Sequence, residues 1–348
     1  MSLGQSRNTR QKNFLLCCLS LVILGIVVSL HGCLSNNSDR KLESNKTPVA
    51  VFLFLQASPD GSTIEGIVPS DLVERSGSLD QVIQSIPVDS NFDLMQFGKS
   101  LTTFSIKAVR GGDAFGAIAS FKLQAPKEQT NPSPKIVSPD ILKQPNLTIV
   151  PHPISAKDAG DKNTQGDRSY FFNCPNKIQP LVLAKSRDLF IKLGAKPTAI
   201  AQVTIASIVC ADIDGDNQPE IIAGLRLDNA IRPVGFDPQS WQGFLSRSAL
   251  ERQEYSILVM LKKIEGGDWQ SETILTNTRS LSYINDSVSS YALHGLQELN
   301  GDHYPELIVK EIGLNSLDVK VISPSIDAQG KWQWSNYYQN QRSLNIVQ

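Results

Sequence analysis

The apolar residues of this chain fall in short runs that turn residues separate. Runs such as Thr204–Cys210 and Tyr255–Leu261 are rich in β-branched and other apolar residues, and Gly, Pro, Asn and Asp lie between such runs. Short runs bounded in this way are typical of strands rather than helices. The sequence therefore predicts a mainly β fold of antiparallel β-hairpin repeats.

A longer pattern occurs twice in the second half of the chain. A hairpin with an acidic loop is followed by a second hairpin whose turn carries Gly shortly before Trp, at Gly266–Trp269 in one unit and at Gln329–Trp332 in the other. Each unit contains four strands, which is the content of one β-propeller blade. We expect Trp269 and Trp332 to pack between blades. Between the hairpins of the first unit, residues 241–252 have the character of a short helix.

The two acidic loops have oxygen-bearing residues at the same positions of a nine-residue segment. The first offers Asp212, Asp214, Asp216, Gln218 and Glu220, and the second offers Glu298, Asn300, Asp302, Tyr304 and Glu306. Position 4 is Gly, which allows a turn that a Cβ would resist, and position 8 is Pro. Calcium takes six to eight oxygen ligands from carboxylates, carbonyls and water. The spacing therefore predicts a Ca²⁺ site in each loop, the alternative being an acidic turn without metal.

The loops differ from an EF-hand, which requires Gly at position 6 and Glu at position 12, where this chain has Asn217 and Ala223. A loop of this kind between two strands resembles the FG-GAP and VCBS-type repeats of integrin α-like β-propellers and bacterial surface proteins. The matching residues are 212–224 and 298–310, and the resemblance covers about 200–340. It implies a propeller or partial propeller that binds calcium through positions 1, 3, 5 and 9 and the backbone of position 7. Because Glu298 stands where that family has Asp, it also implies tighter binding by the first loop.

The first half of the chain has hairpins without an acidic loop. Residues 49–124 contain two of them and predict either a small separate β domain or degenerate blades. Residues 125–168 are rich in Pro and polar residues and predict a linker. The β-repeat domain is then expected over 169–348.

The amino-terminal residues have the features of an export signal. Arg7, Arg10 and Lys12 precede an apolar run, and Cys33 follows it after Gly. One interpretation of 1–33 is a bacterial lipoprotein signal with Cys33 as the lipidated residue, and the other is an uncleaved membrane anchor. Residues 34–48 then form a polar tether. Both interpretations place the remainder in the cell envelope, outside the cytoplasm and attached to the membrane.

Composition indicates which partners the predicted exported part does not bind and whether its cysteines are oxidised. Residues 1–33 contain three basic and no acidic residues, so the rest has 30 basic and 34 acidic residues, a net charge of −4 that argues against nucleic acid. Cys174 and Cys210 are the only cysteines after Cys33. In an oxidising compartment they predict a disulfide, the alternative being two buried thiols.

Sequence motifs of catalysis are missing. The chain has no Gly-x-Ser-x-Gly, His-Glu-x-x-His or glycine-rich phosphate loop, and only four His. The sequence therefore favours a calcium-stabilised module for binding, adhesion or scaffolding, with a protein or glycan as ligand. The alternative is an envelope hydrolase whose site has no familiar motif.

Overall fold

The computed structural model describes residues 50–113, 116–124, 137–152, 169–228, 232–233, 237–264, 266–283 and 286–339. The chain divides into units 1–46 and 47–348, and everything below concerns the second. The predicted leader 1–33 with Cys33, the tether 34–48 and most of the linker 125–168 lie outside the described residues. Within the described part, we find no helix with the length and apolar character needed to cross a membrane.

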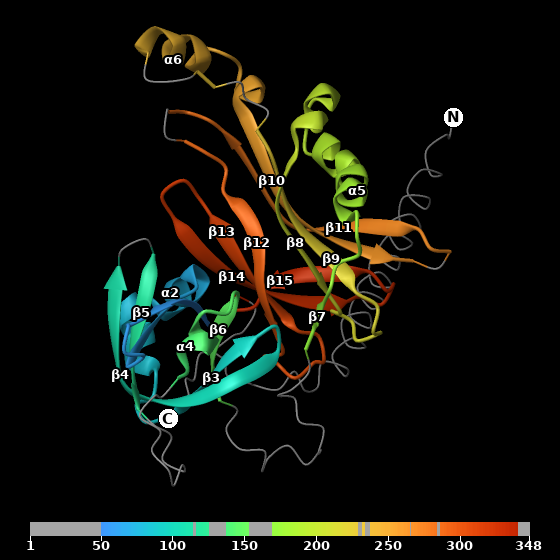
Figure 1. Cartoon of the computed structure of the whole chain (residues 1–348). Helices are drawn as coiled ribbons and strands as arrows, with labels where there is room; N and C mark the ends of the chain where they lie inside the picture. Colours follow the sequence, from blue (N-terminus) through green and yellow to red (C-terminus); the bar gives the residue numbers. More distant parts are fainter. Residues whose placement is uncertain are drawn as a thin grey trace, which may run out of the picture. The chain divides into compact units, whose positions relative to one another are not determined.

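The first part of this unit is a closed barrel with strand order β1-β2-β5-β4-β3-β6 (Figure 1). Its strands are β1 (Phe52–Ala57), β2 (Thr63–Ile67), β3 (Asn91–Gln96), β4 (Lys99–Asp113), β5 (Ala117–Gln124) and β6 (Leu147–Pro151), and its helices are α2 (Ser70–Ser76), α3 (Leu79–Ser85) and α4 (Pro139–Leu142). Aromatic rings fill the interior, where Phe52 and Phe121 lie 5.1 Å apart between ring centroids. Alternation along each strand places such residues inside and polar residues outside.

The barrel extends beyond the boundary that the sequence suggests. Both predicted hairpins of 49–124 are barrel strands, β1–β2 and β4–β5, rather than blades. Residues 139–151 fall in the predicted linker, yet they form α4 and β6. β6 belongs to the barrel because it pairs with both β1 and β3 and so closes the ring of hydrogen bonds.

A five-stranded antiparallel sheet follows, in the order β11-β10-β9-β8-β7. Its strands are β7 (Phe171–Phe172), β8 (Thr204–Ala211), β9 (Glu220–Leu227), β10 (Gln253–Lys263) and β11 (Trp269–Ser280). The helices α5 (Ile178–Lys192) and η1 (Pro197–Gln202) pack on one face over an apolar cluster that includes Phe190 and Tyr255. Between β9 and β10 lie α6 (Pro238–Leu245) and η2 (Ala249–Arg252), over the residues predicted to form a short helix.

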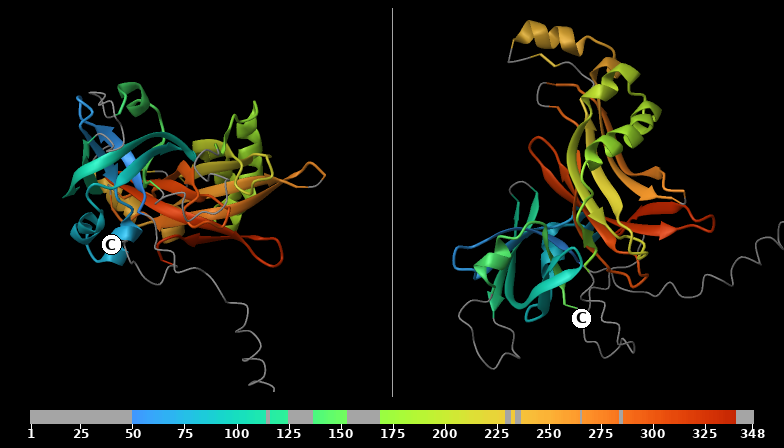
Figure 2. Two further views of the ribbon diagram at one scale, coloured as in Figure 1. Left: turned by 90° about the horizontal axis from the view of Figure 1, so that it is seen from below. Right: turned by 45° about the vertical axis from the view of Figure 1, so that its right-hand side comes forward.

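The last four strands form a second antiparallel sheet in sequence order: β12 (Ser290–Gln297), β13 (Glu306–Ile312), β14 (Leu317–Ile326) and β15 (Trp332–Asn336). One face packs against the five-stranded sheet, and the other contacts the barrel, so the layers run from α5 through two sheets to the barrel (Figures 1 and 2). The two sheets meet closely at Gly224. A Cβ there would lie 1.8 Å from the carbonyl oxygen of Tyr291 on β12.

The prediction of a mainly β, antiparallel fold is confirmed. Each acidic loop lies in the first of two consecutive hairpins, within a five-stranded sheet for the first loop and a four-stranded sheet for the second. The propeller remains a prediction, because the described strands form a barrel and two open sheets rather than a ring of blades. The two tryptophans begin the last strands of their sheets but occupy different clusters. Trp332 packs between the two sheets and Trp269 packs on the α5 side.

Candidate metal centres

The two acidic loops share two unusual backbone positions. Each joins two neighbouring antiparallel strands, β8 to β9 in the first and β12 to β13 in the second. Position 4 has a left-handed φ in both, at Gly215 (82°) and Gly301 (80°). Position 6 does as well, at Asn217 (62°) and His303 (79°). Such φ values are rare outside Gly and Asn, so the agreement at two positions shows that the loops are structural equivalents.

The side chains at positions 1 and 9 make the same internal hydrogen bonds in both loops. The position 1 carboxylate accepts a hydrogen bond from the position 4 amide, at 2.7 Å for Asp212 and 2.6 Å for Glu298. The position 9 carboxylate accepts from the position 2 amide, at 2.8 Å for Glu220 and 2.7 Å for Glu306. Each hydrogen bond holds a carboxylate against the backbone of its own loop, so the carboxylates are oriented before a cation binds.

The middle positions repeat a second pattern. The position 3 side chain accepts from the position 5 amide, and the position 5 side chain accepts from the position 7 amide, in both loops. The resemblance implies a backbone ligand at position 7, which is Gln218 in the first loop and Tyr304 in the second. The ring of Tyr304 there packs on Trp332 with 5.7 Å between ring centroids, so the partly buried phenol side chain lies against the apolar core.

In the first loop, three carboxylates converge. One oxygen from each of Asp212, Asp214 and Asp216 lies within 4.8 Å of the others. Two oxygens bound to one calcium are separated by at most about 5 Å, twice the Ca–O distance, so this cluster has the size of a calcium site. The loop has an additional neighbour that the spacing does not reveal. Lys262 of β10 donates a hydrogen bond to Asp214, and its Nζ lies 3.9 Å from Asp216.

The second loop contains an amide where the first loop has a carboxylate. Asn300 Nδ2 donates to Asp302 at 2.9 Å and to Glu306 at 2.7 Å. Ser323 of β14 also donates to Glu306, at 3.2 Å. Glu298 Oε2 is buried and has no hydrogen-bond partner among the described residues. That oxygen is the feature of the second loop that fits a cation.

The closing glutamates of both loops are almost inaccessible to water. Glu220 is 1% exposed and Glu306 is fully buried. Burial raises the pKa of Glu220 to about 8, although the Ile213 amide bond acts in the other direction. Burial, with the charge of Glu298 second, raises the pKa of Glu306 well above its ordinary value. A buried carboxylate is costly unless a partner compensates its charge, and a bound cation would do so.

The converging carboxylates of the first loop fit a cation such as calcium, whereas the described residues of the second loop bring no three carboxylates together in this way. In the first loop, Lys262 supplies a positive charge to the same oxygens. Burial alone would lower the pKa of Lys262, but the hydrogen bond and charge of Asp214 outweigh burial and raise it, so the side chain is an ammonium ion. In the second loop, the Asn300 amide competes. Carboxylate and carbonyl oxygens, the donor types that these loops offer, match a hard cation such as Ca²⁺.

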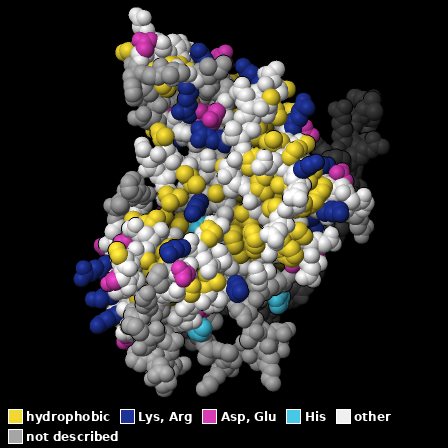
Figure 3. Space-filling model, in the orientation of Figure 1, with side chains coloured by type: hydrophobic (Ala, Val, Ile, Leu, Met, Phe, Trp, Pro, Cys, Tyr) yellow, Lys and Arg dark blue, Asp and Glu magenta, His cyan; other side chains and the backbone are white. Residues whose placement is uncertain are grey.

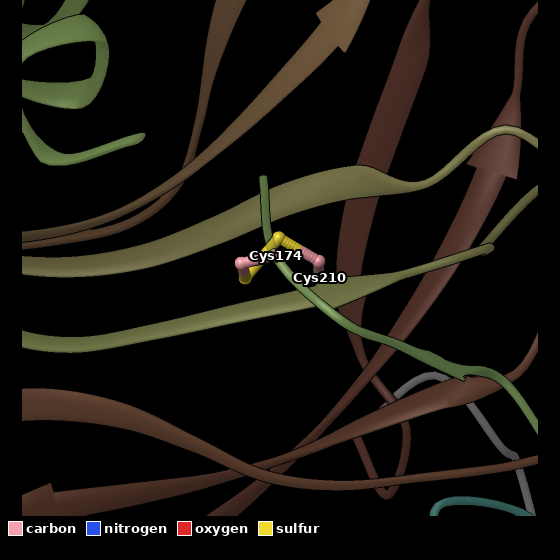
Figure 4. Close-up of a disulfide and its surroundings, with 2 residues drawn as sticks. All are labelled: Cys174 and Cys210. Atoms are coloured by element: carbon pink, nitrogen blue, oxygen red, sulfur yellow. A yellow bond between two sulfur atoms is a disulfide. The ribbon is translucent and has the colours of Figure 1, made fainter. Parts of the chain in front are cut away.

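The described residues include two cysteines, Cys174 and Cys210. Cys174, between β7 and α5, forms a disulfide with Cys210 of β8, with 5.2 Å between Cα atoms (Figure 4). Cys210 is fully buried, and Ala211 and Asp212 follow it directly into the first acidic loop. The disulfide therefore fastens the segment before α5 to the strand that leads into the first site.

Two histidines have environments that the sequence does not reveal. His294 of β12 is buried, and its Nε2–H donates a hydrogen bond to the Leu147 carbonyl at 2.7 Å, so the neutral imidazole carries its proton on Nε2. Burial lowers its pKa to about 3, with the charge of Lys310 second. His152, next to β6, has Nδ1 2.7 Å from the buried Asp93. The Thr103 hydroxyl also donates a hydrogen bond to the Asp93 carboxylate, at 2.5 Å.

Comparisons of this chain with protein-family models, with curated proteins and with solved structures found no match.

Proposed function

We propose that this chain is an exported, membrane-tethered β-repeat protein in which calcium in the acidic loops has a structural role. The observation that supports this most is the agreement between the two loops. They share two left-handed positions and four side-chain-to-backbone hydrogen bonds, although the chain fills position 1 with Asp212 in one and Glu298 in the other. The same hydrogen bonds, made by different side chains, support the same role for these oxygens in both loops.

Calcium would act on the fold through the strands that the loops connect. Both loops have a buried glutamate at position 9, and that residue is also the first residue of β9 or β13. A cation held there would link the loop to a central strand of its sheet. A ligand that binds only the folded state stabilises it by about 2.7 kcal/mol at a concentration one hundred times its dissociation constant.

The module would serve binding, adhesion or scaffolding at the cell envelope, with a protein or glycan as ligand. The membrane attachment would come from residues 1–33, either as a lipoprotein through Cys33 or as an anchor. The mass of the mature protein separates these: Cys33→Ala leaves the leader uncleaved in the lipoprotein case and changes only the mass of one side chain in the anchor case.

Equilibrium dialysis of the metal-free protein against calcium tests the proposal. We expect saturable binding that Asp212→Ala combined with Asp214→Ala reduces and that Glu298→Ala reduces separately. Asp60→Ala is the matched control, because Asp60 is an exposed acidic turn residue bonded to Ser58 and Ser62, outside both loops. Binding that none of the loop variants reduces would disprove calcium at these loops.

A further inference from the structure

β8 has a long neighbouring strand on one edge and only the short strand β7 on the other. It pairs with β9 from Thr204 to Ala211, with one irregularity at Ala206, which the register skips between Ile205 and Ser207. On the other edge, the two-residue strand β7 pairs with Cys210 and Ala211 alone. From Thr204 to Val209, the described part of the chain places no strand on that side. An open row of backbone N–H and C=O groups is a template for another extended chain.

A cavity of about 600 Å³ follows this open edge. Its lining consists of the residues 203–208 and of Gln179 and Leu183 from α5. Successive side chains of a strand point to opposite faces, so a cavity that contacts six consecutive residues lies along the edge rather than over one face. Figure 3 shows apolar side chains gathered on this side of the molecule, around α5 and β8. Leu183 is 37% exposed there.

The edge lacks the charges that protect most open strands. No charged residue occurs from Pro197 to Ala211, a segment that includes η1 and all of β8. β11, the opposite edge of the same sheet, carries Glu272 and Arg279. Natural edge strands are commonly protected from pairing by charged side chains, so the uncharged edge at β8 is the accessible one of the two.

We propose that the β8 edge binds an extended, uncharged segment of a partner protein by β-strand addition. The inference rests on the binding role proposed above and assigns it a surface and a ligand chemistry. The unpaired backbone of 204–209 is complementary to another extended backbone, and the cavity beside it accepts the side chains of that segment. β7 already pairs antiparallel at the end of the same edge, so the incoming strand continues the line that β7 begins.

The space favours a single strand over a second copy of this chain. Pairing of two β8 edges about a two-fold axis would place both α5 helices on the same face of the joined sheet. Because Gln179 and Leu183 of α5 line the same cavity as β8, two helices would compete for that space.

The test uses the full-length protein and a synthetic peptide of alternating threonine and valine, with a lysine at each end. This composition favours an extended conformation and carries no charge in its centre. We expect binding by fluorescence anisotropy and slower hydrogen exchange of the amides in 204–209. N-methylation of alternate peptide residues should abolish binding in one register and preserve it in the other, because only every second residue bonds to the edge.

Ala206→Lys should weaken binding tenfold or more, because it places a charge at an exposed position of the edge. Ala201→Lys is the matched control, since it makes the same change at an exposed residue that does not line the cavity. Absence of protection in 204–209, equal effects of the two variants, or self-association through β8 would each overturn the proposal. Calcium binding measured on the same samples keeps this outcome separate from a failure of the calcium proposal.

Discussion

Lys262 of β10 donates a hydrogen bond to Asp214 in the first acidic loop. β10 and β14 occupy the same place in their sheets, each next to the strand that leaves an acidic loop. Lys262 lies one residue beyond the pair Leu261–Ile221, and Ser323 lies one residue beyond the pair Ile322–Leu307. The structure thus places a lysine beside one loop and a serine at the equivalent position beside the other. The two candidate sites differ in a neighbour that lies more than forty residues away from the first loop in sequence.

Lys262→Met should raise the calcium affinity of the first loop. The ammonium group and calcium compete for the oxygens of Asp214 and Asp216, so removing the ammonium removes the competitor. Two unit charges about 4 Å apart interact by about 4 kcal/mol near a protein surface, and solvent reduces that figure for a side chain that is partly exposed. We expect about tenfold tighter binding in isothermal titration calorimetry.

Lys263→Met is the control for this prediction, because Lys263 is exposed, adjacent in sequence and on the other face of β10. It should leave the calcium affinity unchanged. Equal affinities for the Lys262 and Lys263 variants would show that the Lys262–Asp214 contact does not limit binding.

Gly224→Ala should destabilise the contact between the two sheets. The added Cβ would meet the Tyr291 carbonyl at 1.8 Å and Ser207 Oγ at 2.9 Å, so a backbone has to move. Overpacking a core costs about 1–3 kcal/mol and sometimes more, and a backbone clash belongs at the upper end. Chemical denaturation should show a loss of about 3 kcal/mol or more. Gly112→Ala in β4, where a Cβ meets no atom within 4 Å, should change stability by less than about 0.5 kcal/mol.

The sequence predicts the local features of this fold better than the strand pairing that closes the barrel. The loops follow from the positions of Asp, Gly and Pro within nine residues, and Gly215 takes the left-handed φ that its place requires. The barrel depends on β6, whose residues Leu147–Pro151 follow a Pro-rich stretch and pair with β1, far earlier in the chain. Such a pairing leaves no periodic signal in the segment itself. For the same reason Lys262, which comes from another strand, cannot be found from the spacing of the loop.

Removing the disulfide should lower stability. It closes a sequence separation of 36 residues, for which the chain-entropy relation gives about 4 kcal/mol. We expect that the Cys174→Ala, Cys210→Ala double variant has a lower melting temperature than the oxidised protein. Dithiothreitol should lower the melting temperature of the wild-type protein and leave that of the double variant unchanged. A reductant effect of equal size on both proteins would contradict a stabilising disulfide.

His294 should make the protein less stable in mild acid. Its pKa is about 3 in the folded protein against 6.5 ordinarily, so the unfolded chain binds the proton first as pH falls. Below pH 6.5 unfolding therefore takes up a proton, and stability falls by about 1.4 kcal/mol per pH unit until pH approaches 3. His294→Gln removes this titration. Denaturation curves between pH 7 and pH 4 should fall less steeply for the variant, and parallel curves would rule out the contribution of His294.

The melting temperature of the purified protein in calcium and in chelator tests the central claim most directly. If the acidic loops hold structural calcium, the melting temperature should rise with calcium concentration, because the ion binds the folded state and not the unfolded chain. The rise should be smaller in the Asp212→Ala, Asp214→Ala variant. In Asp60→Ala it should equal the rise of the wild-type protein. Melting curves of the wild-type protein that coincide in millimolar calcium and in excess chelator would contradict the account.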